Sequence, residues 1–98
     1  MGTPKNDRAA VRQIVLALVE AGFTVNTVDY GDGETELVHN VDDAIDEVMA
    51  VDESYLIFHD SRGNDFWVYF VLGNDPEEVV SDHSLSLGKI IDEVVREW

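Results

Sequence analysis

Apolar residues recur along the first part of the chain at the spacing of one face of a helix. Between residues 7 and 21 they fall at i, i+3, i+4, i+7 and i+8. Gly22 follows, and glycine readily takes the left-handed conformation that ends helices. The pattern predicts a first helix over residues 7–21. Its buried stripe would be Val11, Ile14, Val15, Leu18 and Val19.

The next segments predict a hairpin and a second helix. Residues 23–30 are rich in β-branched and aromatic types, and the turn sequence GDGE separates them from residues 35–39. Asn40 is a favourable cap for a helix that follows it. The apolar stripe of that helix is Val41, Ala44, Ile45, Val48 and Met49.

The run YLIFHDSRGNDFWVYFVL, residues 55–72, is the clearest β signal. Two aromatic-rich segments flank the polar loop Ser-Arg-Gly-Asn, which predicts a second hairpin. Helical spacing returns near the C-terminus at Leu87, Ile90, Ile91, Val94, Val95 and Trp98. The order predicts one α+β domain over residues 1–98, with a mainly antiparallel four-stranded sheet of two hairpins and about three helices, arranged α-ββ-α-ββ-α.

The segment GNDPEE, residues 73–78, is explained by turn and helix-cap chemistry. Gly73 and Asn74 tolerate positive φ, and Asp75 before Pro76 is typical of a helix start. Neither this segment nor DYGDGETE spaces its acids as an EF-hand loop does. We therefore predict no metal site here.

Charge changes the picture more than any motif does. The chain has a net charge of −15 and no cysteine, and residues 13–61 carry twelve carboxylates but no Lys or Arg. Direct nucleic-acid binding is not expected, because phosphates are bound by clustered cations, whereas a basic partner protein would be attracted. No apolar run approaches the ~20 residues of a membrane span, so we expect a cytoplasmic protein without membrane contact.

Histidines and acids offer a minor catalytic alternative. His39, His59 and His83 with Asp60 and Asp82 could be imagined as a metal or acid–base cluster, but their spacing fits no specific pattern. The sequence has neither a nucleophile elbow nor a phosphate-binding glycine loop. We expect a non-enzymatic protein with no catalytic residue, cofactor or metal. A small metal-dependent hydrolase using His59 and Asp60 is kept as an alternative.

Several segments together resemble a group of small uncharacterised bacteriophage and prophage proteins. They are EAGFTV, YGDGE, DDAI, VDESYLIFHDSRG and GNDPEEVVSDHS, within residues 11–84. The last segment of that group resembles Gly-Asn-x-Pro-x-Glu-Val-Ile-x-Asp-Tyr, so Val80 and His83 stand where Ile and Tyr are more typical. A tyrosine in place of His83 argues against catalysis there. The resemblance implies a phage or prophage setting and no particular activity.

One candidate contact surface is aromatic. Strand alternation places Tyr55 and Ile57 on one side of a strand, and Trp67 and Tyr69 on one side of the next. If all helices cover the opposite face, these side chains form an exposed surface for a partner or for a homodimer. If a helix covers each face, they are core residues.

The other candidate surface is acidic. Its carboxylates line the second predicted helix and the first hairpin tip: Asp42, Asp43, Asp46, Glu47, Asp29, Asp32, Glu34 and Glu36. They could imitate DNA phosphates and capture a basic, nucleic-acid-binding host protein, or they could simply be a solvated face, or an adaptation to high salt. We predict an accessory protein acting by protein–protein contact, with an acidic DNA-mimic inhibitor as the first alternative.

Overall fold

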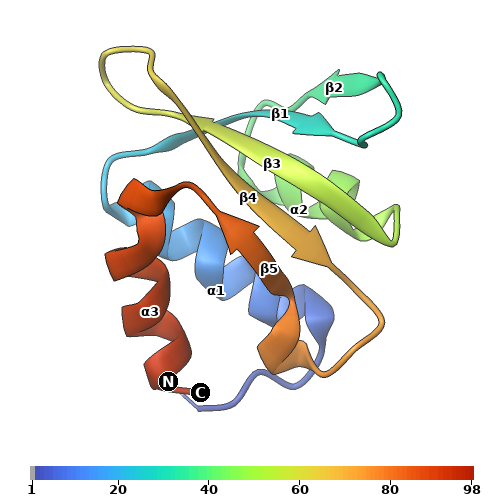
Figure 1. Cartoon of the computed structure of the whole chain (residues 1–98), viewed down its shortest axis with the longest axis vertical. Coiled ribbons are helices and arrows are strands. Elements are labelled where there is room, and N and C mark those ends of the chain that lie inside the picture. The colour runs from blue at the N-terminus through green and yellow to red at the C-terminus, as the bar shows by residue number, and fades with distance from the viewer. Residues whose placement is uncertain (1) are drawn as a thin grey trace.

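The computed structural model describes residues 2–98, which form three α-helices, five strands and two short 3-10 helices (Figure 1). The helices are α1 (Asp7–Glu20), α2 (Val41–Met49) and α3 (Gly88–Arg96). The strands are β1 (Thr24–Asp29), β2 (Thr35–Leu37), β3 (Glu53–His59), β4 (Asp65–Val71) and β5 (Val80–His83), and the 3-10 helices are η1 (Pro76–Glu78) and η2 (Leu85–Leu87). The α+β class and the three helices agree with the sequence prediction.

Side-chain caps define where the first two helices begin. The Asn6 side chain accepts a hydrogen bond from the backbone N–H of Ala9 at 2.9 Å, and the Asn40 side chain accepts one from Asp43 at 2.8 Å. The Asp43 carboxylate reaches back to the backbone N–H of His39 at 3.0 Å. Two backbone donors at the start of α2 are thus satisfied reciprocally, in the manner of a capping box.

The sheet contains one strand more than the two predicted hairpins supply. Its order is β2-β1-β3-β4-β5, every pairing is antiparallel, and β5 lies against β4. The segment after Pro76, predicted as a helix start, makes only the three-residue turn η1, and Asp75 makes no side-chain cap hydrogen bond there. Residues 80–83 then join the free edge of β4. Four residues with a register shift are too few to show a strand period in the sequence.

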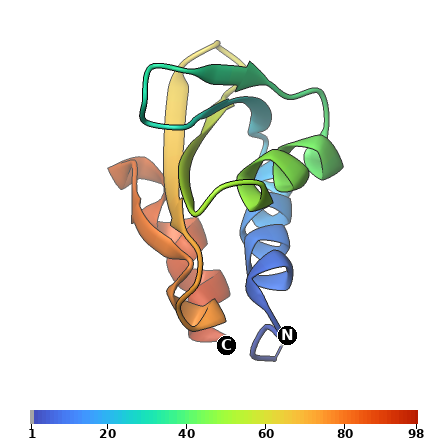
Figure 2. The ribbon, with the colours of Figure 1, turned by 90° about the vertical axis from the view of Figure 1, so that its right-hand side faces the viewer.

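The buried core lies on one face of the sheet. Strand positions on that face are fully or almost fully buried, and they are Val25, Val28, Leu56, Phe58, Val68 and Phe70. They pack against the apolar stripes of all three helices in one cluster. Figure 2 shows α1 and α2 on the same side of β3 and β4, and Figure 1 shows α3 alongside α1. The side chains on the opposite face of the sheet are therefore not part of this core.

Candidate functional site

The outer face of β3 and β4 carries the aromatic residues predicted from strand alternation. Tyr55 pairs with Tyr69 and Ile57 pairs with Trp67 across the two strands. All four side chains are partly exposed, whereas the inward-facing Leu56, Phe58, Val68 and Phe70 on the same strands are buried. Within residues 2–98 no helix covers this face. The structure leaves these side chains partly exposed, which is closer to the first of the two interpretations, and we name this surface the aromatic face.

Three rings of the aromatic face are in contact with one another. Tyr55 stacks on Tyr69 with ring centroids 4.4 Å apart and planes at 18°. Trp67 meets Tyr55 edge-on at 5.7 Å and 66°. Both arrangements are favourable for aromatic pairs, so the three rings hold each other in place. The result is a continuous apolar platform on two neighbouring strands.

Glu53, a carboxylate that was not predicted from the sequence as a site residue, lies at one end of this platform. The Tyr69 hydroxyl donates a hydrogen bond to Glu53 at 2.8 Å. This hydrogen bond is the largest reason why the pKa of Tyr69 is raised above its ordinary value, with desolvation and the Glu53 charge adding to it. Glu53 and Tyr55 are two residues apart on one strand and so share a face. That spacing is the signal that could have identified Glu53.

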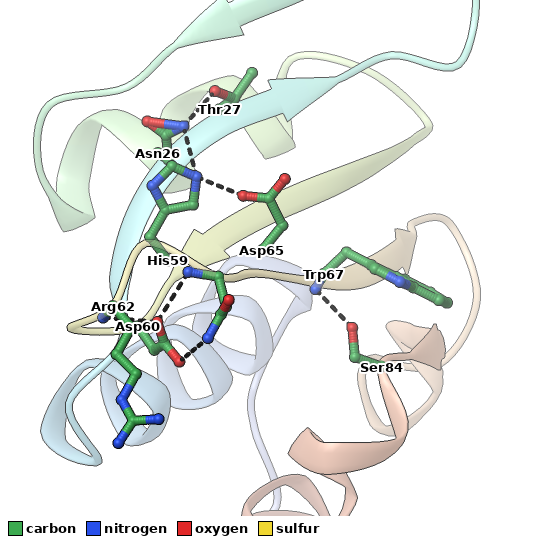
Figure 3. A network of polar contacts seen from close by, with 9 residues as sticks. Asn26, Thr27, His59, Asp60, Arg62, Asp65, Trp67 and Ser84 are labelled. Atoms are coloured by element: carbon green, nitrogen blue, oxygen red, sulfur yellow. Dashed lines mark hydrogen bonds and ion pairs between the residues drawn. The ribbon is translucent and has the colours of Figure 1, made fainter.

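Next to the aromatic face lies a polar patch formed by Asn26, Thr27, His59 and Asp65 (Figure 3). His59 Nε2 is 2.7 Å from a carboxylate oxygen of Asp65 and 3.3 Å from the side-chain nitrogen of Asn26. The contact with Asp65 requires a proton on Nε2, because a carboxylate only accepts, whereas a hydrogen bond from the Asn26 nitrogen requires Nε2 without a proton. Figure 3 shows the Trp67 indole extending from β4 away from this patch.

The Asp60 carboxylate is used by its own hairpin loop. It accepts hydrogen bonds from the backbone N–H groups of Arg62 and Asn64, each at 2.9 Å, and from the Asn64 side chain at 3.1 Å (Figure 3). The backbone bond from Asn64 is the main reason why the pKa of Asp60 is lowered. His59 is paired with Asp65 instead of Asp60. Within residues 2–98, no three His, Cys, Asp or Glu side chains come together as a metal site.

The acidic side chains of α2 all have partners inside the molecule. Arg8 pairs with Asp46 at 2.6 Å and Arg12 pairs with Asp42 at 3.1 Å, which joins α1 to α2. Asp43 is part of the helix cap described above. The basic N-terminal segment therefore compensates much of the acidic array predicted on this helix.

Glu47, the last acid of this array, binds Tyr30 at the end of β1. The Tyr30 hydroxyl donates to the Glu47 carboxylate in a short hydrogen bond. This bond, with desolvation and nearby carboxylates, raises the pKa of Tyr30 to about 12. The interaction links α2 to the sheet and so has a structural role.

The first hairpin tip remains acidic and exposed. The Asp29 carboxylate accepts from the backbone of Gly31 at 2.8 Å, and the Asp32 carboxylate accepts from Glu34 at 3.0 Å. Both bonds span two residues, as Asx turns do. Glu34 and Glu36 are exposed, and both lie near enough to Tyr30, the partner of Glu47, for their charges to help raise the Tyr30 pKa.

The strand β5 adds a residue to the outer face that the sequence could not place. Asp82 lies opposite Tyr69 in the sheet. Together with Ile91 and Val95 of α3 it also lines a shallow cavity of about 240 Å³ beside the strand. His83 lines the same cavity, and its Nδ1 lies 2.8 Å from the carbonyl oxygen of Ser84.

Comparisons with known proteins add no assignment. No protein family matches the chain, and neither a curated protein nor a solved structure is significantly similar to it. Between residues 2 and 98 the structure contains no helix that is long and apolar enough to cross a membrane.

Proposed function

We propose that this chain is a non-enzymatic accessory protein, encoded by a bacteriophage or prophage, that binds a protein partner through the aromatic face. One observation carries the proposal: Tyr55, Ile57, Trp67 and Tyr69 form a contiguous, partly exposed apolar platform on the side of the sheet away from the core. Contiguous exposed patches rich in Tyr and Trp are characteristic of protein interfaces. The phage setting comes from the segment resemblance alone.

The aromatic face is a better candidate than DNA mimicry by the acidic residues. A DNA mimic needs unpaired carboxylates in an array, but Asp42 and Asp46 are paired with arginines and Glu47 accepts from Tyr30. The hydrolase alternative has no supporting geometry, since His59 and Asp60 have separate structural partners. We therefore propose binding without catalysis.

The proposal can be tested by affinity purification of the intact protein from a bacterial host lysate, followed by mass spectrometry. Trp67→Ala and Tyr55→Ala should each lose a partner that the unaltered protein retains. Leu85→Ala is the matched control, because Leu85 is an apolar residue with 96% exposure that lies outside the sheet. Equal capture by all variants, or loss in Leu85→Ala as well, would contradict the proposal. Circular dichroism should show that each variant is folded.

A further inference from the structure

The aromatic face is flanked by carboxylates in a single row that crosses four strands. Asp29 lies opposite Tyr55, Tyr55 opposite Tyr69, and Tyr69 opposite Asp82. Residues directly opposite in antiparallel strands point to the same side of the sheet. The row therefore reads acid, tyrosine, tyrosine, acid from β1 to β5. With strands ~4.8 Å apart, its two ends are separated by roughly 14 Å.

We infer that this row recognises a basic, arginine-bearing segment of the partner protein; the inference rests on the proposed function and specifies the chemistry of the partner. A guanidinium group stacks on aromatic rings and binds carboxylates through paired N–H donors. The row places aromatic rings and carboxylates side by side. The Glu53 carboxylate accepts a hydrogen bond from the Tyr69 hydroxyl and so increases the electron density of that ring, which strengthens its attraction for a cation.

The distribution of charge disfavours a second copy of this chain as the occupant. The strand ranges described in the structure contain no Lys or Arg. Arg8 and Arg12 bind α2, on the side of the sheet that carries the core. A homodimer formed face to face would bring one acidic row against another, which is repulsive, and the strands themselves supply no cation to compensate; Arg62 lies beyond them, in the loop between β3 and β4. A basic partner removes this repulsion and supplies the missing charge.

The row also predicts a spacing in the partner. An extended peptide rises ~3.4 Å per residue, so side chains at positions 1 and 5 lie about 14 Å apart, close to the separation of Asp29 and Asp82. Both side chains would point to the same side of the peptide. A peptide that crosses the strands with arginine at positions 1 and 5 can place one guanidinium near each acid, with its middle over the tyrosines.

The test is an NMR titration of the ¹⁵N-labelled full chain with three blocked peptides. They are Arg-Ser-Gly-Ser-Arg, the same peptide with Lys at both ends, and the same peptide with Gln at both ends. The arginine peptide should shift the amide signals of Tyr55, Trp67 and Tyr69. The lysine peptide should bind roughly two- to fivefold more weakly, because it retains the charge but not the planar stacking group. The glutamine peptide should give no shifts at these residues.

Variants separate local recognition from attraction to the overall negative charge. Asp29→Asn with Asp82→Asn should abolish the shifts, and asparagine keeps an oxygen for the backbone bonds that both aspartates accept. The matched control is Glu20→Gln with Asp75→Asn, which removes the same charge from exposed positions outside the sheet. The control should leave the shifts unchanged. Equal loss in both double variants would overturn the inference.

Two further outcomes separate this inference from the proposed function. If the host partner is lost by Trp67→Ala but retained by the Asp29 and Asp82 variant, the proposed function stands and the basic-segment inference is wrong. If the arginine peptide binds the row but no host protein depends on Trp67 or Tyr55, the recognition chemistry stands and the proposed function is wrong. A concentration-dependent homodimer at low ionic strength that is lost in Trp67→Ala would also overturn the inference.

Discussion

Replacing Arg8 and Arg12 with glutamine should destabilise the protein, mainly at low ionic strength. These two residues pair with Asp46 and Asp42 at 2.6 and 3.1 Å. Glutamine keeps most of the aliphatic stem and removes the charge, so the change reports on the ion pairs more than on packing. The double substitution is informative because Asp42 and Asp46 of α2 would lose their positively charged partners.

The size of the effect follows from solvent exposure. The side chains are 52% and 63% exposed in the first pair, and 53% and 78% exposed in the second. Pairs this exposed contribute in the lower half of the usual range, about 0.3–0.5 kcal/mol each. Losing both should cost about 1 kcal/mol at most. For a domain of this size that corresponds to a decrease in Tm of about 4–8 °C.

Urea denaturation at low salt and at 1 M NaCl is the appropriate assay, because urea is uncharged and does not screen the pairs. At 1 M salt the Debye length shortens to about 3 Å, so the difference between the variant and the unaltered protein should become smaller. Asp42→Asn and Asp46→Asn complete double-mutant cycles that isolate each pair. Lys89→Gln, which removes an exposed positive charge from α3, is the control. A destabilisation that is as large at 1 M NaCl as at low salt, or a coupling of zero in both cycles, would refute the reasoning.

Three further predictions concern the fold. The raised pKa of Tyr30, about 12, means that its neutral form is favoured in the folded state, so the Glu47 hydrogen bond stabilises fully below pH 10 and is lost as the pH rises through 12. The free energy of unfolding of the unaltered protein should exceed that of Tyr30→Phe by about 1 kcal/mol at pH 9, a value discounted for the partial exposure of Tyr30. Urea titrations should show this difference shrinking as the pH rises to 12, and a constant difference would contradict the prediction. Ser84→Ala removes the hydroxyl that accepts a hydrogen bond from the Trp67 backbone N–H at 2.9 Å (Figure 3). The variant should lose about 1 kcal/mol in free energy of unfolding and exchange the Trp67 amide hydrogen faster. Unchanged exchange would exclude the bond. Gly63→Ala should lower the free energy of unfolding by about 1 kcal/mol, because φ is +79° at this position. The cost is one of backbone conformation, since nothing beyond the adjacent residues lies within 4 Å of the added carbon. Unchanged stability in thermal unfolding would argue against this turn geometry.

Sequence patterns identified those elements whose side chains repeat over several turns or pleats. The three helices were predicted because each shows helical spacing over several turns, and both hairpins because β-branched or aromatic segments flank a turn sequence. The strand β5 was not, since Val80–His83 follows a Pro-containing turn and has no alternation of its own. The strand β5 forms because β4 has an unpaired edge, and that edge is defined by the tertiary fold instead of by the local sequence.

The candidate site was only partly predictable for a related reason. Alternation placed Tyr55 and Trp67 on a common face, but both faces of these strands are apolar, so the pattern could not say which one the helices cover. The pairing of Arg8 with Asp46 joins residues 38 positions apart, which local spacing cannot indicate. The opposition of Tyr69 and Asp82 likewise requires the register of an unpredicted strand.

The position of the aromatic face within the sheet determines how much freedom its parts retain. Tyr55 and Trp67 stand on β3 and β4, each hydrogen-bonded to a neighbouring strand on both sides, while Asp82 stands on the short outermost strand β5 beside an irregularity in register. Groups that are already ordered lose little conformational entropy when a ligand arrives. The tyrosines and the indole are therefore ordered by strand pairing on both sides, whereas the order of Asp82 depends on one neighbouring strand and on the hydrogen bond that its carboxylate accepts from the His83 backbone N–H.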